Sequence, residues 1–142
     1  MVTIKNASAI WKGSFKEGGG TISTQSGALN EAAYGVKARF ESGPGTNPEE
    51  LIGAAHAGCF AMAFSLMLGE AGFTPERIEA KAAVTLDKTG DGFSITSSHL
   101  DVAAKIPGIE QARFTEIVNK AKAGCPVSKV LNANITMDAK LV

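Results

Sequence analysis

The segment Leu51–Leu68 is apolar over almost its whole length, and it constrains the fold more than any other part of the sequence. It reads LIGAAHAGCFAMAFSLML, with His56 and Ser65 as its polar residues. A run of about 18 apolar residues is long enough for a membrane span. Acidic residues bound both ends, however, and segments of strand character surround it, so we expect no membrane association. A helix that is apolar on every face must be buried on every face. Because one small sheet cannot cover it, the sequence favours a homodimer.

The start and the end of this helix carry clear signals. Asn47 is a good N-cap, and Pro48 fits the first helical position, where no N–H group is needed. The two glutamates that follow favour the positive end of the helix dipole. Gly72 fits a helix stop. We therefore predict a helix from Leu51 to about Ala71, capped at Asn47.

The other segments predict strands and a second helix. Period-two alternation between turn signals indicates strands at Thr3–Trp11, Gly20–Gln25, Tyr34–Glu41, Ile78–Leu86, Phe93–Lys105 and Asn134–Leu141. An amphipathic pattern predicts a helix over Glu110–Ala123, and a short helical turn is expected from Cys125 to about Leu131. The first three strands are expected to form a small antiparallel sheet. The fold class is therefore α+β, in a single domain of residues 1–142.

The charge and cysteine counts exclude several classes of protein. With 14 basic and 14 acidic residues, the formal net charge is +0, so the chain lacks the basic surface of a nucleic-acid-binding protein. Two cysteines are too few for a disulfide framework or a four-thiolate zinc site. Because the cysteines and the two histidines lack paired ligand spacing, we expect no metal and no cofactor. Residues 1–20 lack the apolar core of a secretory signal, so we expect a cytoplasmic protein with reduced thiols.

The two cysteines lie in different surroundings. Cys59 is about 17 Å along the predicted helix from its start, too far for the helix N-terminus to activate it. Burial among apolar side chains raises the pKa of a thiol, so Cys59 is either an inert core residue or needs a cation from elsewhere. Cys125 opens a short helical turn, where exposed N–H groups favour a thiolate. It either fills a cap position or serves as a resolving thiol.

Arg39 is a candidate for the missing cation. It lies in a predicted strand, where it is either a solvated edge charge or a guanidinium that surrounds a sulfur and a peroxide oxygen with donors. Glu49 is either a helix-start charge or the carboxylate that steadies this arginine. Glu49 and Cys59 are ten residues apart, about 15 Å along a helix, and cannot touch within one straight helix. Either the helix starts later, or Glu49 comes from a partner chain; we favour the second interpretation.

His56 precedes Cys59 by three residues, the spacing of neighbours on a helix surface. Such a pair could activate a nucleophile. We favour a packed histidine instead, because no group that would orient the ring is visible in the nearby sequence.

Two segments with the cysteines resemble a known family. Residues 45–60, GTNPEELIGAAHAGCF, and residues 121–128, AKAGCPVS, are similar to the two cysteine motifs of the OsmC/Ohr family of hydroperoxide-reducing proteins. The similarity continues through YGVKARFE and LMLGEAGFTP and covers nearly the whole chain. The position of Arg39 and the surroundings of Trp11 are more similar to the OsmC branch. The resemblance implies two central helices wrapped by antiparallel strands, in an intertwined homodimer with two active sites at its interface.

The resemblance also implies a role for each candidate residue. Cys59 matches the peroxidatic cysteine, Cys125 the resolving cysteine, Arg39 the activating arginine and Glu49 its acidic partner. The implied substrate is an organic hydroperoxide, with hydrogen peroxide a weaker one. The implied cycle passes through a Cys59 sulfenic acid and a Cys59–Cys125 disulfide, and a dithiol reductant, of lipoyl type in the family, resets it.

Two alternatives to a peroxidase remain open. The same thiols would serve a redox sensor or carrier that reports oxidation without turnover, and they would be core filler in a small-ligand binding module. For a peroxidase, the apolar side chains around Cys59 predict a pocket for the organic part of the hydroperoxide. The residues expected to line it are Phe60, Met62, Phe64 and Met67.

Overall fold

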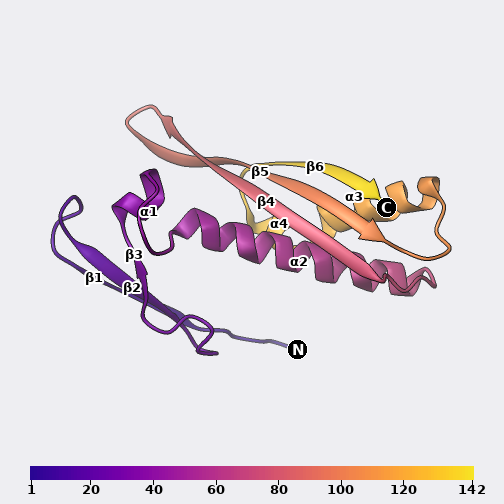
Figure 1. Cartoon of the computed structure of the whole chain (residues 1–142), viewed down its shortest axis with the longest axis horizontal. Coiled ribbons are helices and arrows are strands. Elements are labelled where there is room, and N and C mark those ends of the chain that lie inside the picture. Colours follow the sequence, from indigo (N-terminus) through magenta and orange to yellow (C-terminus); the bar gives the residue numbers. More distant parts are fainter. The chain divides into compact units, whose positions relative to one another are not determined.

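The elements follow the order β1-β2-β3-α1-α2-β4-β5-α3-α4-β6 in a computed structural model that describes all of residues 1–142 (Figure 1). They fall into two units, Met1–Leu51 and Ile52–Val142. Each unit has a three-stranded sheet. The mixed architecture confirms the α+β fold class, while the expected single domain over residues 1–142 stays a prediction.

The first unit contains the small antiparallel sheet that the sequence predicts. Its strands are β1 (Ala7–Lys12), β2 (Gly19–Thr24) and β3 (Ala32–Tyr34), with β2 in the middle. Both pairings are antiparallel. Strand β1 begins four residues later than predicted.

The segment with Arg39 differs from its prediction. The strand expected over Tyr34–Glu41 is wrong, because β3 ends at Tyr34 and a one-turn helix, α1 (Val36–Phe40), follows it. The Arg39 N–H group donates to the Gly35 carbonyl at 3.1 Å, as in a helical turn. A run this short fits the helical and the strand period equally well. Lysine, alanine and arginine, at its centre, are also good helix formers.

Helix α2 (Pro48–Glu70) has the predicted start and stop. The Asn47 side-chain oxygen accepts the Glu50 N–H group at 2.8 Å, which confirms the N-cap. Gly72 follows the helix with a φ of +88°, a left-handed conformation that favours glycine. The Phe73 N–H group then donates to the Leu68 carbonyl at 2.8 Å, closing the last turn.

The second unit has a mixed sheet. Strands β4 (Arg77–Thr89) and β5 (Gly92–Lys105) form an antiparallel hairpin with Gly90 and Asp91 in its turn. Strand β6 (Asn134–Leu141) pairs with β5 in parallel, so the implied wrapping by antiparallel strands is wrong for this pair. Two parallel neighbours need a crossover connection. Helices α3 (Gln111–Gly124) and α4 (Pro126–Val130) supply it.

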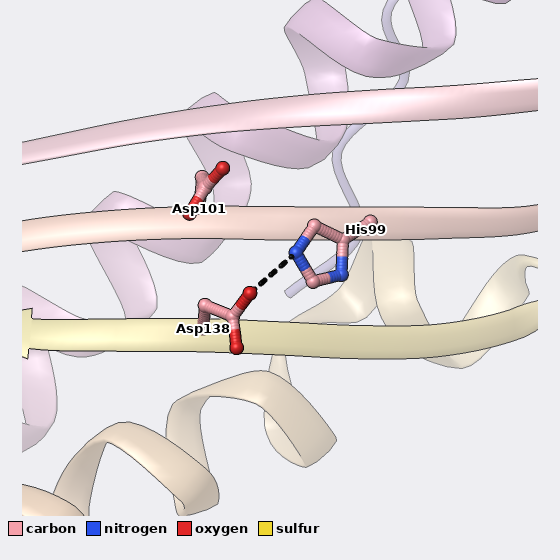
Figure 2. Close-up of side chains that lie close together, drawn as sticks. All are labelled: His99, Asp101 and Asp138. Carbon is pink, nitrogen blue, oxygen red and sulfur yellow. Dashed lines mark ion pairs between the residues drawn. The ribbon is translucent and has the colours of Figure 1, made fainter.

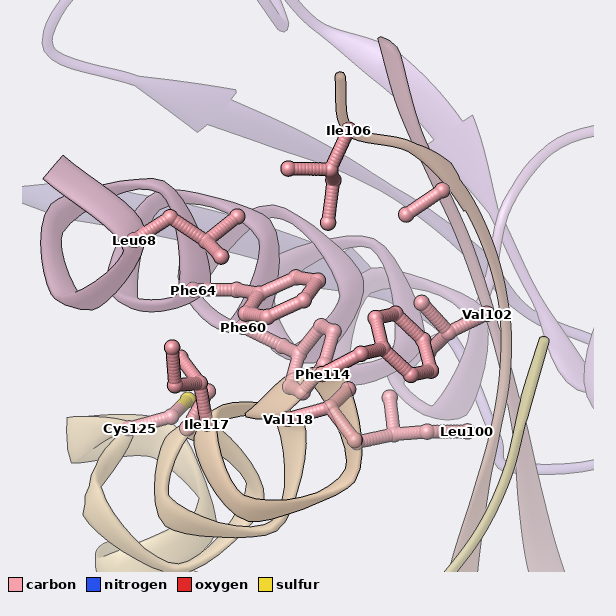
Figure 3. Packing of buried hydrophobic residues seen from close by; sticks show 12 residues of the cluster. Phe60, Phe64, Leu68, Leu100, Val102, Ile106, Phe114, Ile117, Val118 and Cys125 are labelled. Carbon is pink, nitrogen blue, oxygen red and sulfur yellow. The ribbon is translucent and has the colours of Figure 1, made fainter. Parts of the chain in front are cut away.

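The core of the second unit lies between α2, β5 and α3 (Figure 3). Its largest fully buried apolar side chains are Phe60, Phe64, Leu68, Leu100, Phe114 and Val118. The Phe64 ring lies 5.8 Å from Phe60 and 5.9 Å from Phe114, as in packed aromatic pairs. The expectation that Phe60 and Phe64 line a substrate pocket is therefore wrong. Both point into the core, because they occupy the one stripe of α2 that this sheet covers.

Another side of α2 is apolar and exposed. Met62 is 76% exposed and Leu66 is 63% exposed. By its 23 residues and its mean hydropathy of 1.8, α2 is long and apolar enough to cross a membrane. Its other side packs into the core of the second unit.

Candidate active site

The two cysteines, 66 residues apart in sequence, meet in the second unit. Cys59 lies in the middle of α2 and is partly exposed, whereas Cys125 joins α3 to α4 and is fully buried. Their side chains interact, and this interaction raises the pKa of Cys59 and lowers the pKa of Cys125. Two free thiols that interact in this way are placed to form a disulfide.

The surroundings of Cys59 disfavour its thiolate. Burial raises the pKa of Cys59, and so do its hydrogen bond to Cys125 and the negative charge of that neighbour; the Val127 N–H group opposes them. The sequence predicts this direction for an unassisted thiol in an apolar helix. Within this unit, therefore, Cys59 is not an activated nucleophile, and a cation is needed to make it one.

Cys125 has the opposite tendency. Burial alone would raise its pKa, but hydrogen bonds from the Cys59 thiol, from the Ser128 amide and hydroxyl, and from the Val127 amide lower it. These amides lie in the first turn of α4, where N–H groups lack helical partners. The pair is thus polarised, with negative charge favoured on Cys125.

Arg39 and Glu49 form a second pair, in the first unit. Arg39 Nε lies 3.1 and 3.2 Å from the two Glu49 carboxylate oxygens, and Nη2 lies 2.7 Å from Oε1. The Glu49 side chain is 9% exposed and that of Arg39 is 33% exposed. Helix α1 presents the arginine and the first turn of α2 presents the glutamate. The two-point contact fixes the plane of the guanidinium, which is the steadying that the sequence predicts for Glu49.

The start of α2 decides one question that the sequence left open. The helix begins at Pro48, so the alternative of a later start is excluded. Glu49 and Cys59 remain ten residues apart on one helix. The structure thus brings together Arg39 with Glu49 and Cys59 with Cys125, each pair within one unit.

A cavity of about 400 Å³ in the first unit opens beside Arg39. Its lining is mostly apolar and consists of Trp11, Gly13, Phe15, Tyr34, Gly35, Val36, Arg39 and Pro48. The rings of Trp11 and Tyr34 pack edge to face with centroids 5.5 Å apart. An apolar cavity with one cationic wall suits a small organic molecule that carries a polar end.

His56 is fully buried, as the packing interpretation expects, but its ring is oriented by two partners. Nδ1 lies 2.6 Å from the Ser98 hydroxyl and Nε2 lies 2.7 Å from the Ser128 hydroxyl. Burial lowers the pKa of His56, so the ring is neutral at neutral pH.

Sequence reasoning missed both serines. A usable signal exists for Ser98, which occupies the same face of β5 as Leu100, Val102 and Ala104 and is the polar member of that buried row. The signal for Ser128 is weaker. It follows Cys125 by three residues, and side chains at this spacing are neighbours on a helix.

Three chemistry-bearing side chains gather on the solvent face of the second sheet. Figure 2 shows His99 and Asp101 on β5 beside Asp138 on β6. Their ligand atoms lie within 4.8 Å of one another, and His99 Nε2 lies 3.2 Å from an Asp138 oxygen. Thr136 Oγ1 lies 2.6 Å from His99 Nδ1. Both aspartates are exposed to water, so an ordinary surface ion pair accounts for the arrangement.

Comparison with known proteins gives one consistent result. A family described as "OsmC-like protein" matches residues 41–140. The chain is 57% identical, over 99% of both sequences, to Peroxiredoxin OsmC of Escherichia coli strain K12. It is 28% identical to the organic hydroperoxide resistance protein OhrB of Bacillus subtilis, covering 86% of this chain and 88% of that protein. The solved structure of an OsmC-like protein of unknown function from Vibrio cholerae has the same fold, with a TM-score of 0.79 at 15% identity over 97% of this chain and 99% of that one.

Proposed function

The chain belongs to the OsmC-like family, and from this premise we propose that it is a cysteine-based peroxidase that reduces organic hydroperoxides, and hydrogen peroxide more weakly. The high identity to a peroxiredoxin over the full length supports the peroxidase class. The observation that carries the proposal is the interaction between the Cys59 and Cys125 side chains.

The proposed reaction has two chemical steps. The Cys59 thiolate attacks one peroxide oxygen, the O–O bond breaks, and an alcohol or water leaves while Cys59 becomes a sulfenic acid. Cys125 then attacks the Cys59 sulfur, so that an S–S bond forms, the S–O bond breaks and water leaves. A dithiol, of lipoyl type as in the family, reduces the disulfide and restores both thiols.

The cation that Cys59 requires is, in this proposal, Arg39 of the partner subunit, held by Glu49 of the partner subunit. Three observations support it: Cys59 is not activated by its own unit, Glu49 cannot touch Cys59 along one helix, and α2 carries an exposed apolar side. A twofold dimer places the same surfaces of both chains against each other. Each homodimer would then hold two active sites. We further expect the protein to act in the cytoplasm.

The cavity beside Arg39 supports an organic substrate. Trp11, Phe15 and Tyr34 would hold the organic group while the guanidinium binds the peroxide oxygens. The expected result is a higher kcat/KM with cumene hydroperoxide than with hydrogen peroxide. Phe15→Ala should reduce this preference and leave the hydrogen peroxide rate nearly unchanged. An unchanged preference would show that this cavity does not select the substrate.

Turnover distinguishes the peroxidase from a sensor, carrier or binding module. Substoichiometric protein is added to cumene hydroperoxide with dihydrolipoamide, and peroxide loss is followed. A peroxidase continues for many equivalents, whereas a sensor or binder stops near one. Cys59→Ser should abolish the reaction, and Cys125→Ser should allow one turnover before Cys59 overoxidises. Loss of only about one equivalent with the unsubstituted protein would reject the proposal.

A further inference from the structure

A continuous row of polar groups runs through the second unit and ends at the two thiols. Ser98 on β5, His56 on α2 and Ser128 on α4 are joined by the contacts of 2.6 and 2.7 Å at the two ring nitrogens. His56 and Ser98 are both fully buried. A buried imidazole in an otherwise apolar helix is costly unless both nitrogens have partners, and here both have them. None of these three residues takes part in the reaction steps proposed above.

The row reaches the sulfur through Ser128. Cys125 immediately precedes α4, and Ser128 follows it by three residues. The Ser128 hydroxyl and amide and the Cys59 side chain all act on the Cys125 sulfur and lower its pKa. One hydroxyl oxygen therefore lies between the imidazole and the resolving cysteine.

Counting protons fixes the direction of this row. The Ser128 hydroxyl has one proton, so when it donates to Cys125 it cannot also donate to His56. Its oxygen must then accept a proton from His56 Nε2. The neutral ring carries a single N–H group, which leaves Nδ1 as the acceptor of the Ser98 hydroxyl. With Ser128 as the donor to Cys125, all donors point one way, from Ser98 to His56, to Ser128 and to the Cys125 sulfur.

We propose that His56 is a positioning residue for the resolving step: by donating to the Ser128 oxygen, it holds the Ser128 hydroxyl in the orientation that stabilises the Cys125 thiolate. This inference rests on the function proposed above. In that step the Cys125 sulfur attacks the Cys59 sulfenic acid, the S–S bond forms, and the S–O bond breaks. One proton lost from the Cys125 thiol and one gained by the leaving hydroxide balance as water. His56 and Ser128 donate hydrogen bonds throughout and keep their own protons.

The alternative is a purely structural role, in which the row only satisfies buried polar groups. Ser98→Ala and Ser128→Ala separate the two roles. Each removes one hydroxyl and one contact of nearly equal length to the same ring, but of the two serines only Ser128 acts on the Cys125 sulfur. A structural role predicts similar effects from both. The positioning role predicts a much larger effect on disulfide formation from Ser128→Ala.

The experiment is a single turnover of the full-length protein. Reduced protein is mixed with one equivalent of cumene hydroperoxide, and mass spectrometry follows the Cys59 sulfenic acid, the disulfide and the sulfinic acid over time. Ser128→Ala and His56→Leu should each slow disulfide formation by about tenfold, with the formation of the sulfenic acid unchanged. The double variant should be no slower than either single variant, because both act through one hydrogen bond.

A conservative variant tests the donor itself. The amide group of His56→Gln reaches a position similar to that of Nε2, so this variant should recover most of the rate lost in His56→Leu. Disulfide formation at the unsubstituted rate in Ser128→Ala and His56→Leu would overturn the inference, as would equal slowing by Ser98→Ala and Ser128→Ala. If the unsubstituted protein forms no sulfenic acid or no disulfide, the proposed function fails as well.

Discussion

The pKa values of His56, Cys59 and Cys125 depend on burial and on the groups that each side chain contacts. His56 is fully buried and its two partners are neutral hydroxyl groups. Burial lowers the pKa of His56, because no charge in contact with the ring replaces the water that an imidazolium loses. The same loss of water raises the pKa of Cys59, whereas at Cys125 the interactions with Cys59 and with groups of α4 outweigh it and lower the pKa.

The pKa of His56 makes folding stability depend on pH. Above its ordinary pKa of 6.5 the ring is neutral in the folded and unfolded states, and pH has no effect through this group. Below that value the unfolded chain binds a proton more readily than the folded chain does. The free energy of unfolding therefore decreases as the pH is lowered. The slope reaches at most about 1.4 kcal/mol per pH unit, the limit for one proton.

Urea unfolding between about pH 7 and pH 5 measures this slope. The His56→Gln variant has no ionisable group at this position, so its decline should be shallower than that of the unsubstituted protein. Parallel curves for the two proteins would contradict the assignment of a neutral, buried imidazole.

The contacts of these residues could not be predicted from the sequence. The partners of His56 lie 42 and 72 residues away from it, and such separations leave no local pattern. Cys59, Cys125 and Glu49 could be identified as candidates because the two cysteine motifs contain them, and Arg39 because it lies in YGVKARFE. Their roles remain part of the proposal.

At the scale of elements, the bounds of a helix or strand could be predicted from neighbouring residues, whereas the pairing of distant strands could not. Helix α2 was predictable because its cap, its first-turn proline and its terminal glycine are adjacent to it in sequence. Strand β6 was predicted with its observed bounds, yet its parallel pairing depends on a crossover of two helices. The strand predicted over Tyr34–Glu41 is wrong, because five residues do not define a period and these five form α1.

Asn47 links two of these elements. Its side-chain oxygen caps α2, and its side-chain nitrogen donates to the Ala38 carbonyl in α1 at 2.8 Å, next to Arg39. Asn47→Ala loses both contacts and should lower the free energy of unfolding by about 1 kcal/mol.

Asn47→Asp separates the two contacts. The carboxylate keeps the cap but cannot donate to Ala38, so we expect nearly unchanged stability with kcat/KM about tenfold lower, through a displaced Arg39. Denaturant melts and steady-state kinetics on both variants measure these effects. Full activity in Asn47→Asp would mean that this tether does not position the arginine.

At the scale of the whole molecule, the proposed site needs two chains. If Arg39 and Glu49 serve the cysteine of the partner subunit, a Glu49→Ala chain and a Cys59→Ser chain complement each other. Each protein alone should be inactive. Random mixed dimers, half of the population with one intact site each, should recover about one quarter of the unsubstituted activity. Co-expression of both chains, purification and a peroxidase assay measure this; no recovery above the two parents would place the whole site in one chain.

The position of Cys125 in the crossover between β5 and β6 has a consequence for the heat resistance of the protein. A bond from Cys59 to Cys125 closes a loop of 66 residues that contains the β4-β5 hairpin and α3. Closing a loop of this length removes conformational entropy from the unfolded chain and is worth about 4 kcal/mol. Calorimetry should therefore find the peroxide-treated protein melting roughly 10 °C above the dithiol-treated protein, with no such difference in Cys125→Ser. The disulfide form of the protein, before a dithiol reduces it, would therefore be the form that best survives heating.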